Sequence, residues 1–250
     1  MKRILLFFVL FTYIYPVYLK VFPIPTDRIL QIISFAFCIL NITFIKKTLR
    51  IKNIYLFYFL SLIILVTIFL TQSWNYSTID LYFFKYHINI FFYLFPSVLI
   101  AYLLYKIDRN KMIVNLLDYI IFTAILQALV SFLFTFNSSV FEFYISLLSP
   151  NSSQVFLDRL FLIDKRLFGI SSSLFSGVIK WGIPFFILIL LPYLKNSIIY
   201  KNKIIYILSL ILIVTAGIMT ARTFFVAILL GIIFFCFLER KNLILLITKI

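Results

Sequence analysis

Long uninterrupted runs of apolar residues constrain this chain more than any other feature of its sequence. Eight of them come close to the length that crosses the ~30 Å hydrocarbon core of a bilayer as a helix. They are Ile4–Leu19, Ile29–Ile45, Ile54–Leu70, Ile88–Tyr105, Ile113–Phe136, Leu174–Leu194, Ile204–Thr220 and Phe224–Leu238, and Asn242–Ile250 begins a ninth. Helices satisfy every backbone hydrogen bond within such a segment. We therefore expect an all-α, polytopic membrane protein in which residues 1–250 form a single integral membrane domain.

The composition excludes an ordinary soluble domain. Hydrophobic residues make up 64% of the chain and charged residues only 12%, whereas soluble domains are about half apolar and about a quarter charged. The 23 Lys and Arg residues exceed the 8 Asp and Glu residues and give a net charge of +15. Because these cations cluster between apolar runs, we interpret them as determinants of membrane topology. The expected surroundings are a lipid bilayer, and no nucleic-acid partner is expected.

The distribution of cations orients the chain. Alternate connections, beginning with the N-terminus, hold 14 Lys and Arg in 30 residues, and the remaining connections hold 7 in 66. The first set is 1–3, 46–53, 106–112, 195–203 and 239–241; the second is 20–28, 71–87, 137–173 and 221–223. Cytoplasmic loops carry the excess of Lys and Arg. The sequence thus predicts a cytoplasmic N-terminus, with the second set of connections on the outer face.

The connection 137–173 is much longer than the others with which it alternates. Long loops often carry function. Within it, Val155–Phe168 places Asp158 and Arg159 seven residues before Lys165 and Arg166, with apolar residues elsewhere. This periodicity predicts a short amphipathic helix in the membrane interface. A solvated amphipathic helix would have the same pattern, and the periodicity does not distinguish the two.

Three cations are candidates for binding an anionic ligand at the outer face. Lys180 lies within an apolar run, and Arg222 lies in a turn between two short runs, where a charge is costly unless it meets an anion. Arg166 and Lys180 flank Gly169 and a small-residue segment that allows close approach. Together they suit a lipid-linked diphosphate. The alternative for Arg222 is simple anchoring to lipid phosphate.

Few other residues suggest chemistry within the spans. Asp118 lies about one turn from the cytoplasmic end of its run, where we expect its carboxylate to reach water. No acidic residue falls near the middle of a run, which disfavours an ion-coupled transporter. The sequence has no cluster with metal-ligand spacing and no glycine-rich phosphate loop. No metal or other cofactor is therefore expected.

Two segments together resemble a known family. One is Lys165-Arg166-Leu167-Phe168-Gly169-Ile170 at the end of the long outer loop, and the other is Thr220-Ala221-Arg222-Thr223 at an outer helix turn. Their order, predicted sidedness and spacing are similar to those of the bacterial O-antigen polymerases and the related O-antigen ligases. The resemblance covers roughly 60 residues, and the rest of the chain matches only as a series of hydrophobic helices.

The resemblance implies a GT-C-like membrane glycosyltransferase of the bacterial inner membrane. It would join undecaprenyl-diphosphate-linked oligosaccharide repeat units into O-antigen or another polysaccharide at the periplasmic face, without a metal. Arg166 and Arg222 would be catalytic, by neutralising the diphosphate leaving group. The substrate-binding residues would be Arg159, Lys165, Lys180 and Gly169, and the candidate general bases are Asp158, Asp164 and Glu142. The implied protein partners are a chain-length regulator and a flippase of the same pathway.

The chain also departs from the family pattern. The family generally has more spans and a second large outer loop, so the resemblance implies a C-terminally truncated form that lacks part of the active site. Three other functions remain open, and one of them is a non-enzymatic membrane scaffold. An O-antigen ligase is expected to use an outer-loop histidine, but the sole histidine, His87, lies in a different loop. A flippase of lipid-linked oligosaccharides would need a charged central cavity.

Overall fold

The computed structural model describes residues 1–22, 24–43, 62–63, 66–67, 69–70, 82–150, 174–194, 196–220 and 224–247. It places their side chains except in 82–91, 174–179 and 237–247. The elements are α1 (Lys2–Ile14), α2 (Thr26–Leu40), α5 (Tyr82–Ile107), η1 (Arg109–Lys111), α6 (Met112–Phe136), α7 (Ser138–Leu147), α9 (Leu174–Leu190), η2 (Leu191–Tyr193), α10 (Ile198–Lys201), α11 (Lys203–Thr220) and α12 (Phe224–Ile247). The described part of the chain is therefore all-helical, as predicted.

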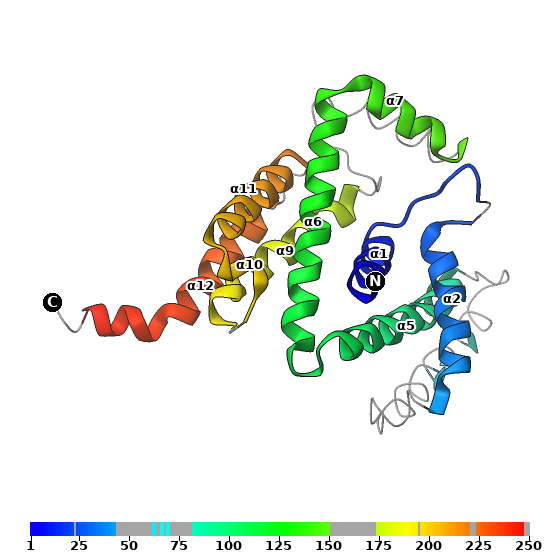
Figure 1. Cartoon of the computed structure of the whole chain (residues 1–250), viewed down its shortest axis with the longest axis horizontal. Coiled ribbons are helices and arrows are strands. Elements are labelled where there is room, and N and C mark those ends of the chain that lie inside the picture. The colour runs from blue at the N-terminus through cyan, green and yellow to red at the C-terminus, as the bar shows by residue number, and fades with distance from the viewer. Residues whose placement is uncertain are drawn as a thin grey trace.

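The long helix α6 separates two groups of helices (Figure 1). On one side, α1, α2 and α5 bury an apolar cluster that contacts Met112, Leu116 and Tyr119 of α6. On the other side, α9 to α12 bury a second cluster that includes Ile121, Ala124 and Ala128. Different faces of α6 thus pack into the two clusters, and α6 joins the two groups of helices.

Two of the described helices are long and apolar enough to cross a bilayer. They are Arg109–Phe136, which includes η1 and α6, and α11. Shorter apolar helices cover Phe92–Ile107, Lys180–Tyr193 and Phe224–Cys236. The expected eight spans and partial ninth are not established by these helices, and the span Ile54–Leu70 lies mostly outside the described residues.

The outward faces of the C-terminal helices suit an apolar environment. On α11, Ile204, Ile207, Leu208 and Ile211 are exposed, while Ser209, Ile213, Ala216 and Gly217 are buried. This is the reverse of a water-facing helix, because the large apolar side chains point outward and the small ones pack inward. The burial pattern of α11 therefore agrees with contact to lipid.

The first helix is shorter than its apolar run predicts. The run Ile4–Leu19 gives a helix that ends at Ile14, because Pro16 disfavours helical backbone at Tyr15. Tyr15 has φ −121° and ψ 71°. Thirteen residues of helix extend only about 20 Å, and α1 is seen nearly end-on beside the upright α6 (Figure 1). The run Ile4–Leu19 is therefore helical over Lys2–Ile14 and not over its whole predicted length, and this shorter helix does not establish a first span.

Three other helix boundaries differ from the predictions. Residues 82–87, predicted as part of an outer connection, belong to α5, and this places His87 within a helix. The long loop begins with α7, whose first turn is capped by the Asn137 side chain accepting from the Val140 amide at 3.2 Å. The expected connection at 239–241 is absent because α12 continues to Ile247. Glu, Arg and Lys favour helix, and no Gly or Pro interrupts them.

Backbone pairing joins two of the connections that were predicted to share the outer face. The Lys20 amide donates to the Leu147 carbonyl at 2.8 Å, and the Ser149 amide donates to the Tyr18 carbonyl at 2.9 Å. They flank an isolated antiparallel bridge between Leu19 and Leu148. The segment after α1 and the end of α7 therefore lie together, as expected if both emerge on the same side.

Gly217 allows α11 and α12 to meet closely. A Cβ atom at Gly217 would lie 2.6 Å from the ring of Phe224, which is fully buried and cannot move aside freely. At Gly182, a Cβ atom would meet Ala227 at an ordinary 3.6 Å. We expect Gly217→Ala to destabilise the fold by about 1–3 kcal/mol through overpacking.

The matched control for this prediction is Gly182→Ala, which adds the same methyl group within a helix. We expect it to be neutral or slightly stabilising, because alanine favours helix. Chemical unfolding of both variants in mixed micelles measures the difference. Equal stability of the two variants would contradict the close α11–α12 packing.

Candidate functional site

Of the nine site residues predicted from the sequence, the structure describes Lys180 and Glu142. The other seven, which are Asp158, Arg159, Asp164, Lys165, Arg166, Gly169 and Arg222, lie outside the described residues, as does the predicted helix Val155–Phe168. Glu142 lies on α7 with an exposed side chain and does not line the cavity described below. The described geometry therefore bears mainly on Lys180.

Lys180 lines a cavity between α1, α5, α6 and α9. The cavity has a volume of about 480 Å³, and most of its wall is apolar. Leu10 and Ile14 of α1, Ile100 and Leu104 of α5, and Leu116 and Ile120 of α6 contribute to that wall. This volume lies within the range of small-molecule sites and is large enough for several methylene or isoprene units.

The Lys180 ammonium is held against an aromatic ring. Its Nζ atom lies 5.5 Å from the centroid of the Tyr15 ring, within the range of a cation–π interaction. Tyr15 is only 2% exposed, so the surrounding side chains hold its ring in place. Tyr15 also lines the cavity, so this contact joins two residues of its wall.

Pro184 interrupts the backbone hydrogen bonding of α9 one helical turn after Lys180. It lies inside α9, four residues after Lys180, and lines the same cavity. A proline has no amide hydrogen and cannot donate to the carbonyl four residues earlier, which here is that of Lys180. The lysine and the proline thus lie about one helical turn apart in the wall of the same cavity.

A pair of hydroxyl groups supplies the other polar part of the wall. The Tyr13 hydroxyl and the Ser97 hydroxyl lie 3.3 Å apart and connect α1 to α5. Both residues line the cavity. The cavity is therefore lined by one lysine, two hydroxyl-bearing residues and an almost entirely apolar surface, which suits the hydrocarbon part of an amphiphile.

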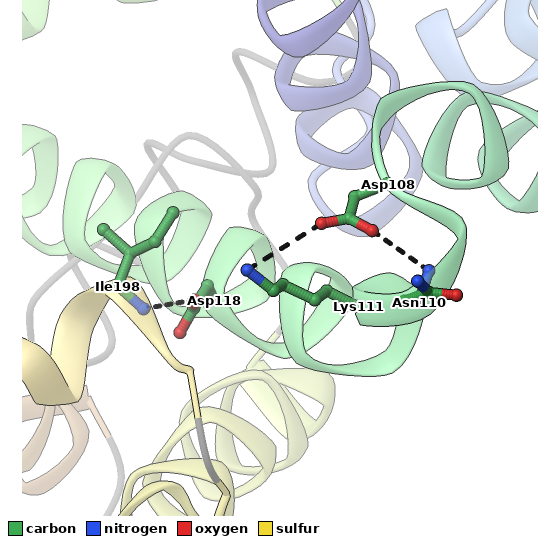
Figure 2. A network of polar contacts seen from close by, with 5 residues as sticks. All are labelled: Asp108, Asn110, Lys111, Asp118 and Ile198. Atoms are coloured by element: carbon green, nitrogen blue, oxygen red, sulfur yellow. Dashed lines mark hydrogen bonds and ion pairs between the residues drawn. The ribbon is translucent and has the colours of Figure 1, made fainter.

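Asp118 does not reach water, contrary to the sequence prediction. Its side chain is 1% exposed. Its carboxylate accepts a hydrogen bond from the Ser197 hydroxyl at 2.6 Å and another from the Ile198 amide at 2.8 Å. Figure 2 shows the bond to Ile198 at the start of α10. Ser197 and Ile198 cover the carboxylate. Their hydrogen bonds to Asp118 hold the connection between α9 and α11 against α6.

Asp108, in the same view, has a different environment. It accepts from the Asn110 amide at 3.0 Å and lies 4.0 Å from the Lys111 ammonium (Figure 2). The Lys111 and Asp108 side chains are 45% and 36% exposed. The Asp108 side chain caps the short helix η1. Its exposed ion pair with Lys111 contributes little to stability. We therefore expect the Asp118 carboxylate to stabilise the fold more than the Asp108 carboxylate does.

Sequence reasoning did not identify Tyr15, Tyr13 or Ser97 as site residues. The composition offers no signal for them, because tyrosine and serine occur throughout the apolar runs. Among the described residues, no group of three or more His, Cys, Asp or Glu side chains could hold a metal ion. Comparison of the chain with models of protein families, with curated proteins and with solved structures found no match.

Proposed function

We propose that this protein is a polysaccharide polymerase of the bacterial inner membrane. It transfers a growing glycan from undecaprenyl diphosphate to another lipid-linked repeat unit at the outer face. The observation that carries the proposal is that Lys180, whose ammonium lies against the Tyr15 ring, lines a 480 Å³ apolar cavity. A polyprenyl diphosphate has the matching chemistry, since it joins a hydrocarbon chain to a multiply charged anion.

The proposed reaction needs positive charge more than it needs a metal. The acceptor hydroxyl attacks the anomeric carbon of the donor glycan, the bond from that carbon to the diphosphate oxygen breaks, and the diphosphate leaves as an anion. Arg166 and Arg222 stabilise the developing negative charge, which is often the largest catalytic contribution. Lys180 binds the diphosphate, and Arg159 and Lys165 assist. A carboxylate takes the proton of the acceptor hydroxyl, with Asp158, Asp164 and Glu142 as the candidates.

Deleting the gene and separating the lipopolysaccharide on a gel tests this function against its alternatives. Loss of a polymerase leaves core lipid that carries a single repeat unit. Loss of a ligase or a flippase leaves bare core, and this outcome would reject the polymerase. An unchanged ladder of chain lengths would reject all three functions.

Two arginine substitutions test the roles drawn from the sequence. We expect Arg166→Ala and Arg222→Ala each to abolish long-chain product, because removing one group that stabilises transition-state charge costs about 10²–10³ in rate. Complementation of the deletion strain, with product length read on the gel, measures the effect. Lys20→Ala, at another segment predicted on the outer face, is the control and should leave chain length normal. Wild-type chain length in both arginine variants would contradict their assignment.

A further inference from the structure

One face of α2 carries polar side chains into the interior. Asp27, Gln31 and Ser34 are spaced four and three residues apart, so they share a helix face. They are 7%, 3% and 0% exposed. This face turns away from the exposed apolar side chains of Ile32 and Ile33, and α2 packs mainly against α5. We call the three residues and the surrounding α2–α5 contact the polar seam.

Part of the polar seam is satisfied by neighbouring side chains. The Tyr93 hydroxyl of α5 donates a short hydrogen bond to Oδ2 of Asp27. The Arg28 guanidinium donates to Oε1 of Gln31 at 3.0 Å. Tyr93 in turn packs edge-on against Tyr13, with ring centroids 5.9 Å apart. The seam therefore lies one aromatic ring away from the wall of the Lys180 cavity.

Three other atoms of the seam have no protein partner among the described residues. They are Oδ1 of Asp27, Nε2 of Gln31 and Oγ of Ser34, and each is buried. Buried polar atoms are nearly always hydrogen-bonded, and a polar group left unbonded in an apolar interior is strongly unfavourable. The three atoms thus indicate a bound group that both donates and accepts hydrogen bonds.

The chemistry of the three atoms defines that group. Asp27 Oδ1 only accepts when ionised, the Gln31 amide nitrogen only donates, and the Ser34 hydroxyl does both. The Arg28 guanidinium already supplies a positive charge at Gln31, which favours a neutral ligand over a cation. Because the three side chains are almost fully covered, the ligand is small.

We propose that the polar seam binds ordered water. Asp27 and Ser34 are seven residues apart, about 10 Å along a helix axis, so one molecule cannot reach both. At least two waters are needed, one that accepts from Gln31 Nε2 while donating to Asp27 Oδ1 and another at Ser34. Buried waters of this kind usually make about three hydrogen bonds each and form part of the structure. The seam is thus a hydrated site between α2 and α5, next to the Lys180 cavity, and it does not depend on the proposed function.

Radiolytic labelling of the protein in lipid vesicles tests the proposal directly. X-rays convert bound water into hydroxyl radicals, which oxidise the side chains beside it, and mass spectrometry then gives the modification rate of Tyr93. The test variant combines Gln31→Leu with Ser34→Ala, and the control is Ile33→Ala on the exposed side of α2. We expect the Tyr93 rate to fall several-fold in the test variant and to remain unchanged in the control. Equal rates in the wild type and the test variant would overturn the proposal.

Two further measurements distinguish bound water from a bound cation and from an empty seam. Labelling in sodium chloride and in choline chloride should give the same Tyr93 rate, and a rate that depends on sodium would assign the site to a cation. The midpoint of thermal unfolding should fall for Ser34→Ala, because a hydroxyl bonded to water is lost. If that midpoint rises instead, Ser34 has no bound partner and the seam holds no water there.

Discussion

Lys180→Met is expected to weaken binding of undecaprenyl diphosphate by about 10- to 100-fold. A hydrogen bond to a charged group contributes about 1.5–3 kcal/mol, and each 1.4 kcal/mol is about a tenfold change in affinity. Methionine keeps much of the apolar length of lysine and removes the ammonium, which lies against the Tyr15 ring at the cavity wall. Native mass spectrometry of the protein in nanodiscs titrated with undecaprenyl diphosphate measures the change.

Lys106→Met is the matched control for this prediction. Its ammonium also lies over a tyrosine ring, 5.7 Å from the centroid of Tyr102, but Lys106 is exposed and does not line the cavity. We expect its affinity to remain at the wild-type value. A loss of affinity as large in this variant as in Lys180→Met would mean that nonspecific charge, and not the cavity, binds the lipid.

The apolar part of the cavity has its own test. Undecaprenol, which has the same chain and no phosphate, should bind equally to the wild type and to Lys180→Met. Ala101→Leu adds bulk at the cavity wall and should weaken binding of both lipids. If only the diphosphate is affected by Ala101→Leu, the tail does not occupy this cavity.

Asp118→Ala is expected to cost about 3 kcal/mol or more in the free energy of unfolding. The substitution removes a buried carboxylate and leaves the Ser197 hydroxyl and the Ile198 amide without their acceptor. Each hydrogen bond to a charged group contributes about 1.5–3 kcal/mol, and a buried donor left unpaired adds its own desolvation cost. Asp118→Asn should have an intermediate effect, because the amide retains one accepting oxygen. Chemical unfolding in mixed micelles measures the three proteins.

Asp108→Ala is the control for this loss of stability. Asp108 also accepts one backbone hydrogen bond and faces one cation, but it is exposed. We expect it to cost less than about 1 kcal/mol, as exposed ion pairs do. Similar costs for Asp108→Ala and Asp118→Ala would show that Asp118 is not buried against the α9–α11 connection in the membrane-embedded protein.

The helix α6 was predicted almost residue for residue, whereas the ends of α1 and α12 were not. The run Ile113–Phe136 is bounded by a charged turn and by Asn137, and both boundaries appear in the structure. The run Ile4–Leu19 passes through Pro16 without losing its apolar character, so hydropathy did not mark the end of α1. The charged residues 239–241 were predicted to form a connection between two spans. Glu, Arg and Lys also favour helix, and α12 continues through them.

The sequence analysis singled out Lys180 but did not predict its surroundings. A lysine in an apolar run is unusual enough to be noticed, and Lys180 does line the cavity. Tyr15, by contrast, lies 165 positions away in the chain, and its contact with Lys180 depends on how α1 and α9 pack. Asp118 was misjudged for the same reason, because the residues that cover it are about 80 positions away. Local pattern cannot reveal contacts that only tertiary packing creates.

Polymerisation by the purified protein tests the central proposal most directly. The protein is reconstituted in vesicles with a radiolabelled repeat unit linked to undecaprenyl diphosphate, and the products are separated by length. The proposed function predicts a ladder of chain lengths for the wild type and for Lys106→Met, a ladder for Lys180→Met that needs a higher lipid concentration, and a single unextended unit for Arg222→Ala. A wild-type protein that binds the labelled lipid but leaves it as a single unit would contradict the assignment as a polymerase.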